Sequence, residues 1–224
     1  MELSKRLTAV AGLVTEGASV ADIGTDHGYI PIHLIEQNLS PKVIAMDINK
    51  GPLERARIHI AGYGMSDRIE TRLSDGLAAV KPKEVEEMIV AGMGGGLVIH
   101  ILNEDPAKTR SLKELVLQPQ SELAKVRRYL EEHRFRIVAE DMVEEDGKYY
   151  PMMKVIPTEQ KGLYAEGVPA AEEELEYGKY LLEKAHPVMG EYLKKELSVN
   201  QGVYESFGCR RVNARRREVQ RFCI

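Results

Sequence analysis

The chain has 224 residues, of which 43% are hydrophobic, and a formal net charge of −4. This size suits one domain, or one domain with a small appendage, and buries enough surface to fold without disulfides or a structural metal. Cys209 and Cys223 lie fourteen residues apart with no histidine between them, so neither a metal site nor a disulfide framework is predicted. No apolar run reaches ~18 residues. We therefore expect a cytoplasmic protein without membrane spans. The sequence leaves the oligomeric state open, and we favour a monomer.

The first residues predict an amphipathic helix over 3–14, because apolar side chains recur there at helical spacing. A lysine and an arginine precede an apolar stretch, which also resembles a signal peptide, but acidic residues follow too soon for one. Short apolar segments then alternate with helical patterns, which predicts an α/β fold with a Rossmann-like parallel sheet covered on both faces. The predicted strands are 19–23, 42–47, 69–73, 87–91 and 114–118, and the predicted helices are 30–36, 52–63, 97–102 and 122–133.

The pattern changes near residue 135. Residues 135–143 and 148–156 are strand-like and flank Asp146-Gly147, a dipeptide typical of hairpin turns. This terminal hairpin is predicted to add an antiparallel strand to the otherwise parallel sheet.

A helical appendage is predicted at the C-terminal end. Residues 157–169 contain two prolines and two glycines and predict a linker. Leu175, Leu182 and Met189 then lie seven residues apart, which is typical of a small coiled-coil-like hairpin of helices, although a proline interrupts it. We therefore divide the chain into a domain at 1–157 and a helical domain at 158–224.

The most informative motif follows the first predicted strand and opens a helix. It reads Val20-Ala-Asp-Ile-Gly-Thr-Asp-His-Gly-Tyr29. A glycine-rich turn there lets the backbone approach a ligand, and the helix N-terminus supplies free N–H groups. A dinucleotide site would have glycine where Asp26 stands, because a carboxylate would repel a pyrophosphate. S-adenosylmethionine has no phosphate and carries an ammonium and a sulfonium. Asp22 and Asp26 therefore suit this cofactor, while Gly24 and Gly28 make room for it.

Acidic residues also follow the next two strands. Asp47 ends the second strand, 23 residues after Gly24, where nucleotide-binding sheets place the acceptor for ribose hydroxyls. Asp75 and Gly76 follow the third strand and offer a carboxylate and an N–H to an adenine edge. Each acid alone is more often a helix N-cap, but three successive acidic strand ends predict a cofactor site. His27 could instead be a packed histidine. The predicted cofactor-binding residues are Asp22, Gly24, Thr25, Asp26, His27, Gly28, Asp47, Ile48, Asp75 and Gly76.

The fourth strand runs into a loop of mostly backbone, Ala91-Gly-Met-Gly-Gly-Gly96, with no evident general base. It lacks the Asn-Pro-Pro-Tyr sequence usual in enzymes that methylate exocyclic nitrogens. Such a loop suits an acceptor with a free lone pair, such as ring N1 of adenine, which needs alignment rather than deprotonation. A carboxylate would stabilise the cation developing on the base, and Asp26 is our candidate. Gly92, Met93 and Gly94 complete the predicted catalytic set, unless the glycines only form a tight turn.

Together these motifs resemble those of the bacterial TrmK family, the tRNA (adenine-22-N1)-methyltransferases. The matching stretches are Leu3-Ser-Lys-Arg-Leu7, Ala21-Asp-Ile-Gly-Thr-Asp-His-Gly-Tyr-Ile-Pro31, Asp47, Arg72-Leu-Ser-Asp-Gly76, Ala91-Gly-Met-Gly-Gly95 and Leu117-Gln-Pro-Gln120. The resemblance implies a class I methyltransferase domain with a C-terminal helical hairpin. It implies S-adenosylmethionine as cofactor and N1 of an adenine in the D-loop region of tRNA as acceptor. It also implies that the acidic loops line the cofactor site and that Gly92–Gly94 face the target base.

A tRNA partner requires cationic side chains for its phosphates. From Gly208 onward the chain has six arginines and one glutamate, a basic tail that is more arginine-rich than we expect for the family. Arg127 and Arg128, in the predicted helix 122–133, could instead belong to its solvated face, and Tyr29 could belong to the core. The predicted RNA-binding residues are Arg6, Tyr29, Arg127, Arg128, Arg210, Arg211, Arg215 and Arg216.

Two other functions fit the same cofactor motifs. A methyltransferase for small molecules would use them but would need neither a basic tail nor a helical appendage. A non-catalytic protein could use the same fold to sense the cofactor or to bind RNA.

Overall fold

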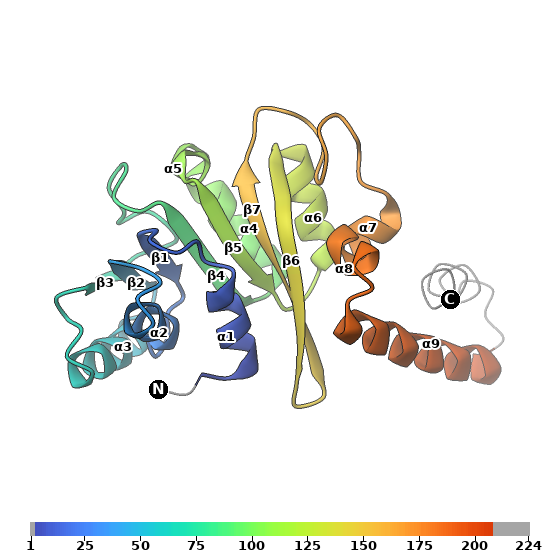
Figure 1. The fold of residues 1–224 in the computed structure, drawn as a ribbon, viewed down its shortest axis with the longest axis horizontal. Helices are drawn as coiled ribbons and strands as arrows, with labels where there is room; N and C mark the ends of the chain where they lie inside the picture. The colour runs from blue at the N-terminus through green and yellow to red at the C-terminus, as the bar shows by residue number, and fades with distance from the viewer. Residues whose placement is uncertain (1–2, 208–224) are drawn as a thin grey trace.

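A computed structural model describes residues 3–207 and shows a seven-stranded β-sheet at their centre (Figure 1). The first five strands in sequence pair in parallel, and β7 pairs antiparallel with both of its neighbours. The predicted α/β class, with a parallel sheet and a terminal hairpin, is therefore confirmed. The order across the sheet is β3 (Ile69–Leu73), β2 (Val43–Asp47), β1 (Val20–Ile23), β4 (Glu87–Met93), β5 (Glu114–Pro119), β7 (Lys148–Pro157) and β6 (Phe135–Glu145).

Helices cover both faces of the sheet, as the alternation of strand and helix patterns predicts. One face carries α1 (Lys5–Gly12), α2 (Tyr29–Glu36) and α3 (Lys50–Gly62), whose apolar residues join one buried cluster. The other face carries α4 (Gly95–Glu104) and α6 (Leu123–Glu132), with α5 (Pro106–Ser111) next to α4. Within residues 3–207, every helix is too short or too polar to span a bilayer.

The central strands are buried along their whole length. Every residue of β1 and β2 is buried, because helices lie on both sides and leave no solvent-facing positions. This accounts for the continuous apolar segments of the sequence. A strand with one solvent-exposed face would instead alternate apolar and polar residues. Parallel pairing places the carboxyl ends of these strands at one edge of the sheet, where the predicted site loops begin.

The C-terminal helices pack against the sheet domain. They are α7 (Glu172–Tyr177), α8 (Lys179–Glu183) and the long α9 (Pro187–Phe207), which runs away from the sheet in Figure 1. Tyr177, Leu181 and Met189 form a buried cluster with Met142 of β6. Leu163, in the segment predicted as a linker, is buried in the main core beside the sheet. The division at residue 157 stays a prediction.

The environment of Arg127 differs from that of a typical RNA-binding arginine, because its side chain is fully buried in α6. Its guanidinium lies 2.9 Å from Oε1 of Glu140 on β6, whose side chain is also fully buried. It donates two more hydrogen bonds, to the carbonyls of Leu175 and Glu176, at 2.9 and 3.0 Å. One arginine thus connects α6, β6 and α7, because a buried charge requires a complete set of partners.

Candidate active site

The carboxyl ends of β1, β2 and β4 bring three loops together. Gly24 N and Thr25 N both donate to the carbonyl of Met46 on β2, at 2.8 and 2.9 Å. Gly24 and Gly28 have φ of 74° and 73°, in the left-handed region that favours glycine. A Cβ at Gly24 would lie 2.2 Å from Cε of Met93. Gly24 therefore gives both the turn and the space that the β4 loop needs to approach β1.

A cavity of about 510 Å³ opens beside these loops, within the size range of small-molecule sites. Its walls come from α1, from β1 and the loop after it, from the start of α2, from the end of β4, and from the β6–β7 hairpin. It brings together eight residues predicted for the site, namely Arg6, Asp22, Gly24, Thr25, Asp26, His27, Tyr29 and Gly92. The other lining residues are Ser4, Leu7, Ile30, Ala91, Glu145 and Tyr150.

Asp22 is the buried carboxylate of this cavity. Burial raises the pKa of Asp22 to about 6, and the nearby carboxylate of Asp47 adds to the increase. A cationic ligand would favour the ionised form of Asp22, because it would replace the lost hydration with an opposite charge. The site therefore has an electrostatic preference for a positive group.

Asp26 and His27 form the outer wall of the cavity. The Asp26 side chain is 58% exposed, and its Oδ1 accepts a hydrogen bond of 2.8 Å from Arg55. The His27 ring stacks on Tyr29 with centroids 5.2 Å apart, and His59 lies tilted against both rings. Nδ1 of His27 is buried and has no hydrogen-bond partner within residues 3–207, so it can bond to a ligand.

The predicted residues after β2 and β3 lie at the same edge of the sheet but do not line this cavity. Asp47 is only 7% exposed, and its Oδ1 accepts a hydrogen bond of 2.7 Å from Asn49 N. Ile48 is 60% exposed beside it. In the β3 loop, Asp75 is exposed and Gly76 is buried. Because β1, β2 and β3 pair in parallel, these four residues lie along the sheet edge on which the cavity opens.

One set of side chains in the described part of the chain has the spacing of metal ligands. Ligand atoms of Asp75, His100 and Glu104 lie within 4.8 Å of one another, and all three residues are exposed. His100 and Glu104 also pair along α4 at 3.4 Å. The absence of a metal, predicted from the sequence, stays a prediction.

The end of β4 and the loop after it, residues 91–96, are held by both backbone and side-chain contacts. Gly92 lines the cavity, whereas Met93 and Gly94 do not. Met93 O accepts from Gln120 N at 2.8 Å. A Cβ at Gly95 would lie 2.6 Å from the carbonyl of Ser121. The glycine run therefore permits close packing of the β4 and β5 loops, and it presents Gly92 to the cavity.

The sequence interpretation missed Gln118 and Tyr150. Gln118 is fully buried on β5, and its Oε1 accepts from both Gly92 N and Arg6 Nη1, at 3.1 and 3.0 Å. The Arg6 guanidinium in turn lies 5.6 Å from the ring centroid of Tyr150 on β7. The stretch Leu117–Gln120 resembles the TrmK family, but no role was predicted for Gln118 itself.

The predicted RNA-binding residues have different environments. Arg6 lines the cavity, and Tyr29 is 36% exposed at its wall. Arg128 is exposed and pairs with Glu172 at 3.0 Å. Arg127 is buried, as described above. The predicted residues Arg210, Arg211, Arg215 and Arg216 lie outside the described residues.

Comparison with known proteins gives consistent matches. A family model described as a methyltransferase domain matches residues 3–153. The chain is 32% identical over 205 residues to the tRNA (adenine(22)-N(1))-methyltransferase of Bacillus subtilis, covering 92% of this chain and 85% of that relative.

Solved structures agree with these matches. A Streptococcus pneumoniae protein, determined in complex with S-adenosyl-L-methionine, is 30% identical, with a TM-score of 0.87 and full coverage of both chains. TrmK of M. capricolum, in complex with S-adenosyl-homocysteine, is 26% identical with a TM-score of 0.82, covering 100% of this chain and 98% of that one. The chain therefore belongs to the TrmK family of methyltransferase-domain proteins, the tRNA (adenine-22-N1)-methyltransferases.

Proposed function

We propose that this chain transfers a methyl group from S-adenosylmethionine to N1 of adenine 22 in tRNA. The main support is the cavity at the ends of β1 and β4. The buried carboxylate of Asp22 and the Gly92 backbone, which has no side chain, both line it. The relative in Bacillus subtilis bears this activity in its name, and the Streptococcus pneumoniae neighbour binds the cofactor. We further propose that the enzyme acts in the cytoplasm, where its substrate is, and as a monomer.

The residues present fit the cofactor. The buried Asp22 carboxylate suits an ammonium group, and Nδ1 of His27 is available for a hydrogen bond. The positive φ of Gly24 permits the turn by which the segment after β1 borders the cavity. Asp47 would hold the ribose hydroxyls, and the remaining loop residues would enclose the adenine, with Ile48 against its face and Asp75 and Gly76 at its edge.

When bound, the cofactor supplies a methyl group activated by the positive sulfur. The protein must align this group with the acceptor nitrogen, because N1 of adenine already has a free lone pair. Gln118 fixes the Gly92 backbone and Arg6 with one carbonyl oxygen, so both keep a defined position at the cavity. As positive charge moves onto the base, the Asp26 carboxylate would stabilise it, with Gly92 facing the base and Met93 and Gly94 supporting Gly92 from outside the cavity.

Mapping of modified nucleotides tests the function. In tRNA from a strain that lacks this protein, N1-methyladenine at position 22 should be absent, and complementation should restore it. The measurement is mass spectrometry of tRNA fragments, with empty-vector complementation as control. Methyl transfer only to small amines or phenols would support the small-molecule alternative. Binding of cofactor and tRNA by purified protein without transfer would support the non-catalytic one.

Cofactor affinity should depend on pH through Asp22. The raised pKa of about 6 means that Asp22 is mostly protonated at pH 5 and ionised at pH 7. Because only the ionised form attracts an ammonium, the Kd should be about tenfold weaker at pH 5 than at pH 7. Calorimetric titration at both pH values measures this, and Asp22→Asn should remove most of the difference. An equally steep change in that variant would show that another group is responsible.

A further inference from the structure

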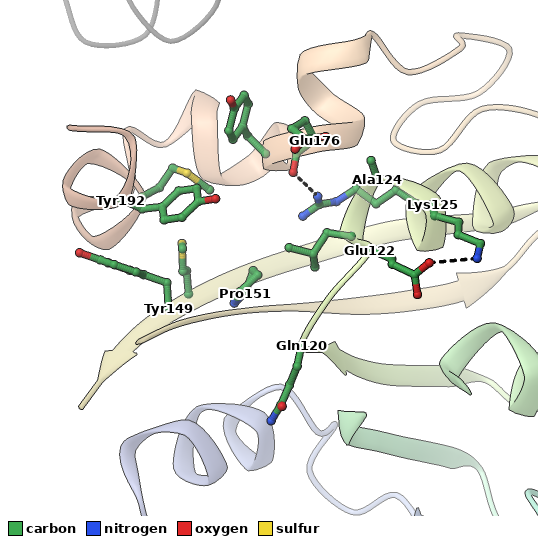
Figure 2. Close-up of a pocket in the computed structure, with 13 residues that line it drawn as sticks. Gln120, Glu122, Ala124, Lys125, Tyr149, Pro151, Glu176 and Tyr192 are labelled. Carbon is green, nitrogen blue, oxygen red and sulfur yellow. Dashed lines mark hydrogen bonds and ion pairs between the residues drawn. The ribbon is translucent and has the colours of Figure 1, made fainter. Parts of the chain in front are cut away.

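A second cavity, of about 460 Å³, lies between the β6–β7 hairpin, α6 and the C-terminal helices (Figure 2). Side chains alternate along β7, so Tyr149 and Pro151 line this cavity while Tyr150 lines the first. Met142 of β6 and Tyr192 of α9 also belong to the apolar part of its wall. The two cavities therefore lie on opposite faces of one hairpin.

The loop after β5 connects the second cavity to the proposed acceptor site. Gln120 and Glu122 line the second cavity. Gln120 N also donates to Met93 O at 2.8 Å, and Glu122 Oε2 accepts from Gly96 N at 2.9 Å. In Figure 2, Gln120 extends away from the tyrosines toward α1. A ligand in the second cavity would thus lie beside the loop that presents Gly92 to the first.

The walls have the chemistry of a base-stacking site. The rings of Tyr149 and Tyr192 meet edge to face, with centroids 5.3 Å apart. The Tyr192 hydroxyl donates to Glu196 at 2.9 Å, which fixes the ring. Lys195 does not line the cavity, but its Nζ lies 5.1 Å from the Tyr149 ring centroid and donates to Gly147 O at 3.2 Å, so a positive charge for a phosphate lies next to this ring. Aromatic rings beside a cation are the usual features of sites for unpaired nucleotides.

We propose that the second cavity binds an unstacked nucleobase of the tRNA substrate, a neighbour of the methylated adenine. This inference rests on the proposed function. An adenine that is to be methylated at N1 must leave its stack or pair, which costs free energy. A neighbouring base that stacks on Tyr149 offsets part of that cost and keeps the RNA strand open at the first cavity. The C-terminal helices contribute one wall, which gives them a role in substrate binding.

Substitution of Tyr149 tests this site. Tyr149→Ala should weaken tRNA binding about tenfold, because a base loses its stacking partner. Tyr149→Phe should bind like the wild type, since it keeps the ring. Tyr149→Leu keeps an apolar side chain but removes the ring, so it should also weaken tRNA binding. This variant replaces Tyr149→Ala as the test if the alanine variant fails to fold. Tyr63→Ala, at an exposed tyrosine on the end of α3, is the matched control and should have no effect.

The measurements are the Kd for tRNA by fluorescence anisotropy and the Kd for cofactor by calorimetry. The cofactor Kd should be equal in all variants. Ultraviolet cross-linking of tRNA should also yield a peptide that carries Tyr149 or Tyr192. A Tyr149→Leu protein that folds and binds tRNA like the wild type would overturn the proposal. Because tRNA binding is measured without turnover, a wild type that binds tRNA but does not methylate it would contradict only the proposed function.

Discussion

Replacing Arg127 by methionine is expected to lower the free energy of unfolding by about 3 to 5 kcal/mol. The side chains of Arg127 and Glu140 are both fully buried, so the substitution leaves a carboxylate in the core without its counter-charge. It also removes the donors for the carbonyls of Leu175 and Glu176, which connect α6 to α7. Urea denaturation followed by circular dichroism measures the change.

The neighbouring arginine is a matched control. Arg128 lies on the same helix, is exposed, and pairs with the exposed Glu172. Exposed ion pairs contribute at most about 1 kcal/mol, so Arg128→Met should leave stability nearly unchanged. If both substitutions lowered the free energy of unfolding equally, the buried contacts of Arg127 with β6 and α7 would not be what stabilises the fold. The double variant Arg127→Met with Glu140→Met should recover part of the loss, because no unpaired charge then remains in the core.

Arg127 also shows where prediction from the sequence fails. Its position, four residues after Leu123 and three before Leu130, is on the apolar face of α6, but its charge favours a solvent-exposed side chain. A partner thirteen residues away on β6 makes burial of that charge possible. Such a pairing depends on how the helix lies against the sheet, which is a long-range property. By contrast, the strands of the sheet were predictable because apolar runs between turn residues are local signals.

A local signal was also overlooked. Helix α5 begins with Asp105-Pro106, and the Asp105 side chain accepts from Lys108 N at 3.0 Å. An N-cap acid followed by proline is a known start of a helix, so α5 could have been predicted. In the candidate site, the acids at strand ends were recognisable for the same reason. Gln118 and Tyr150 were not, because their contact with Arg6 requires the register of three distant segments.

Replacing Asp47 by alanine is expected to weaken cofactor binding by on the order of 100-fold, because hydrogen bonds to a buried carboxylate are charge-assisted. Asn49 N already donates to one carboxylate oxygen, which orients the group and leaves the other oxygen for a ribose hydroxyl. Calorimetry with S-adenosylmethionine measures the effect. Asp67→Ala, at an exposed acid in the turn after α3, is the control and should bind normally.

The same variant tests the electrostatics of the site. The Asp47 carboxylate is one of the causes of the raised pKa of Asp22, so its removal should lower that pKa. The pH at which cofactor affinity declines should therefore move below 6 in Asp47→Ala, although the affinity is weaker at every pH. If the midpoint instead stays near 6, burial alone sets the pKa of Asp22. Loss of affinity together with a lower midpoint would show that both carboxylates act within one cofactor site.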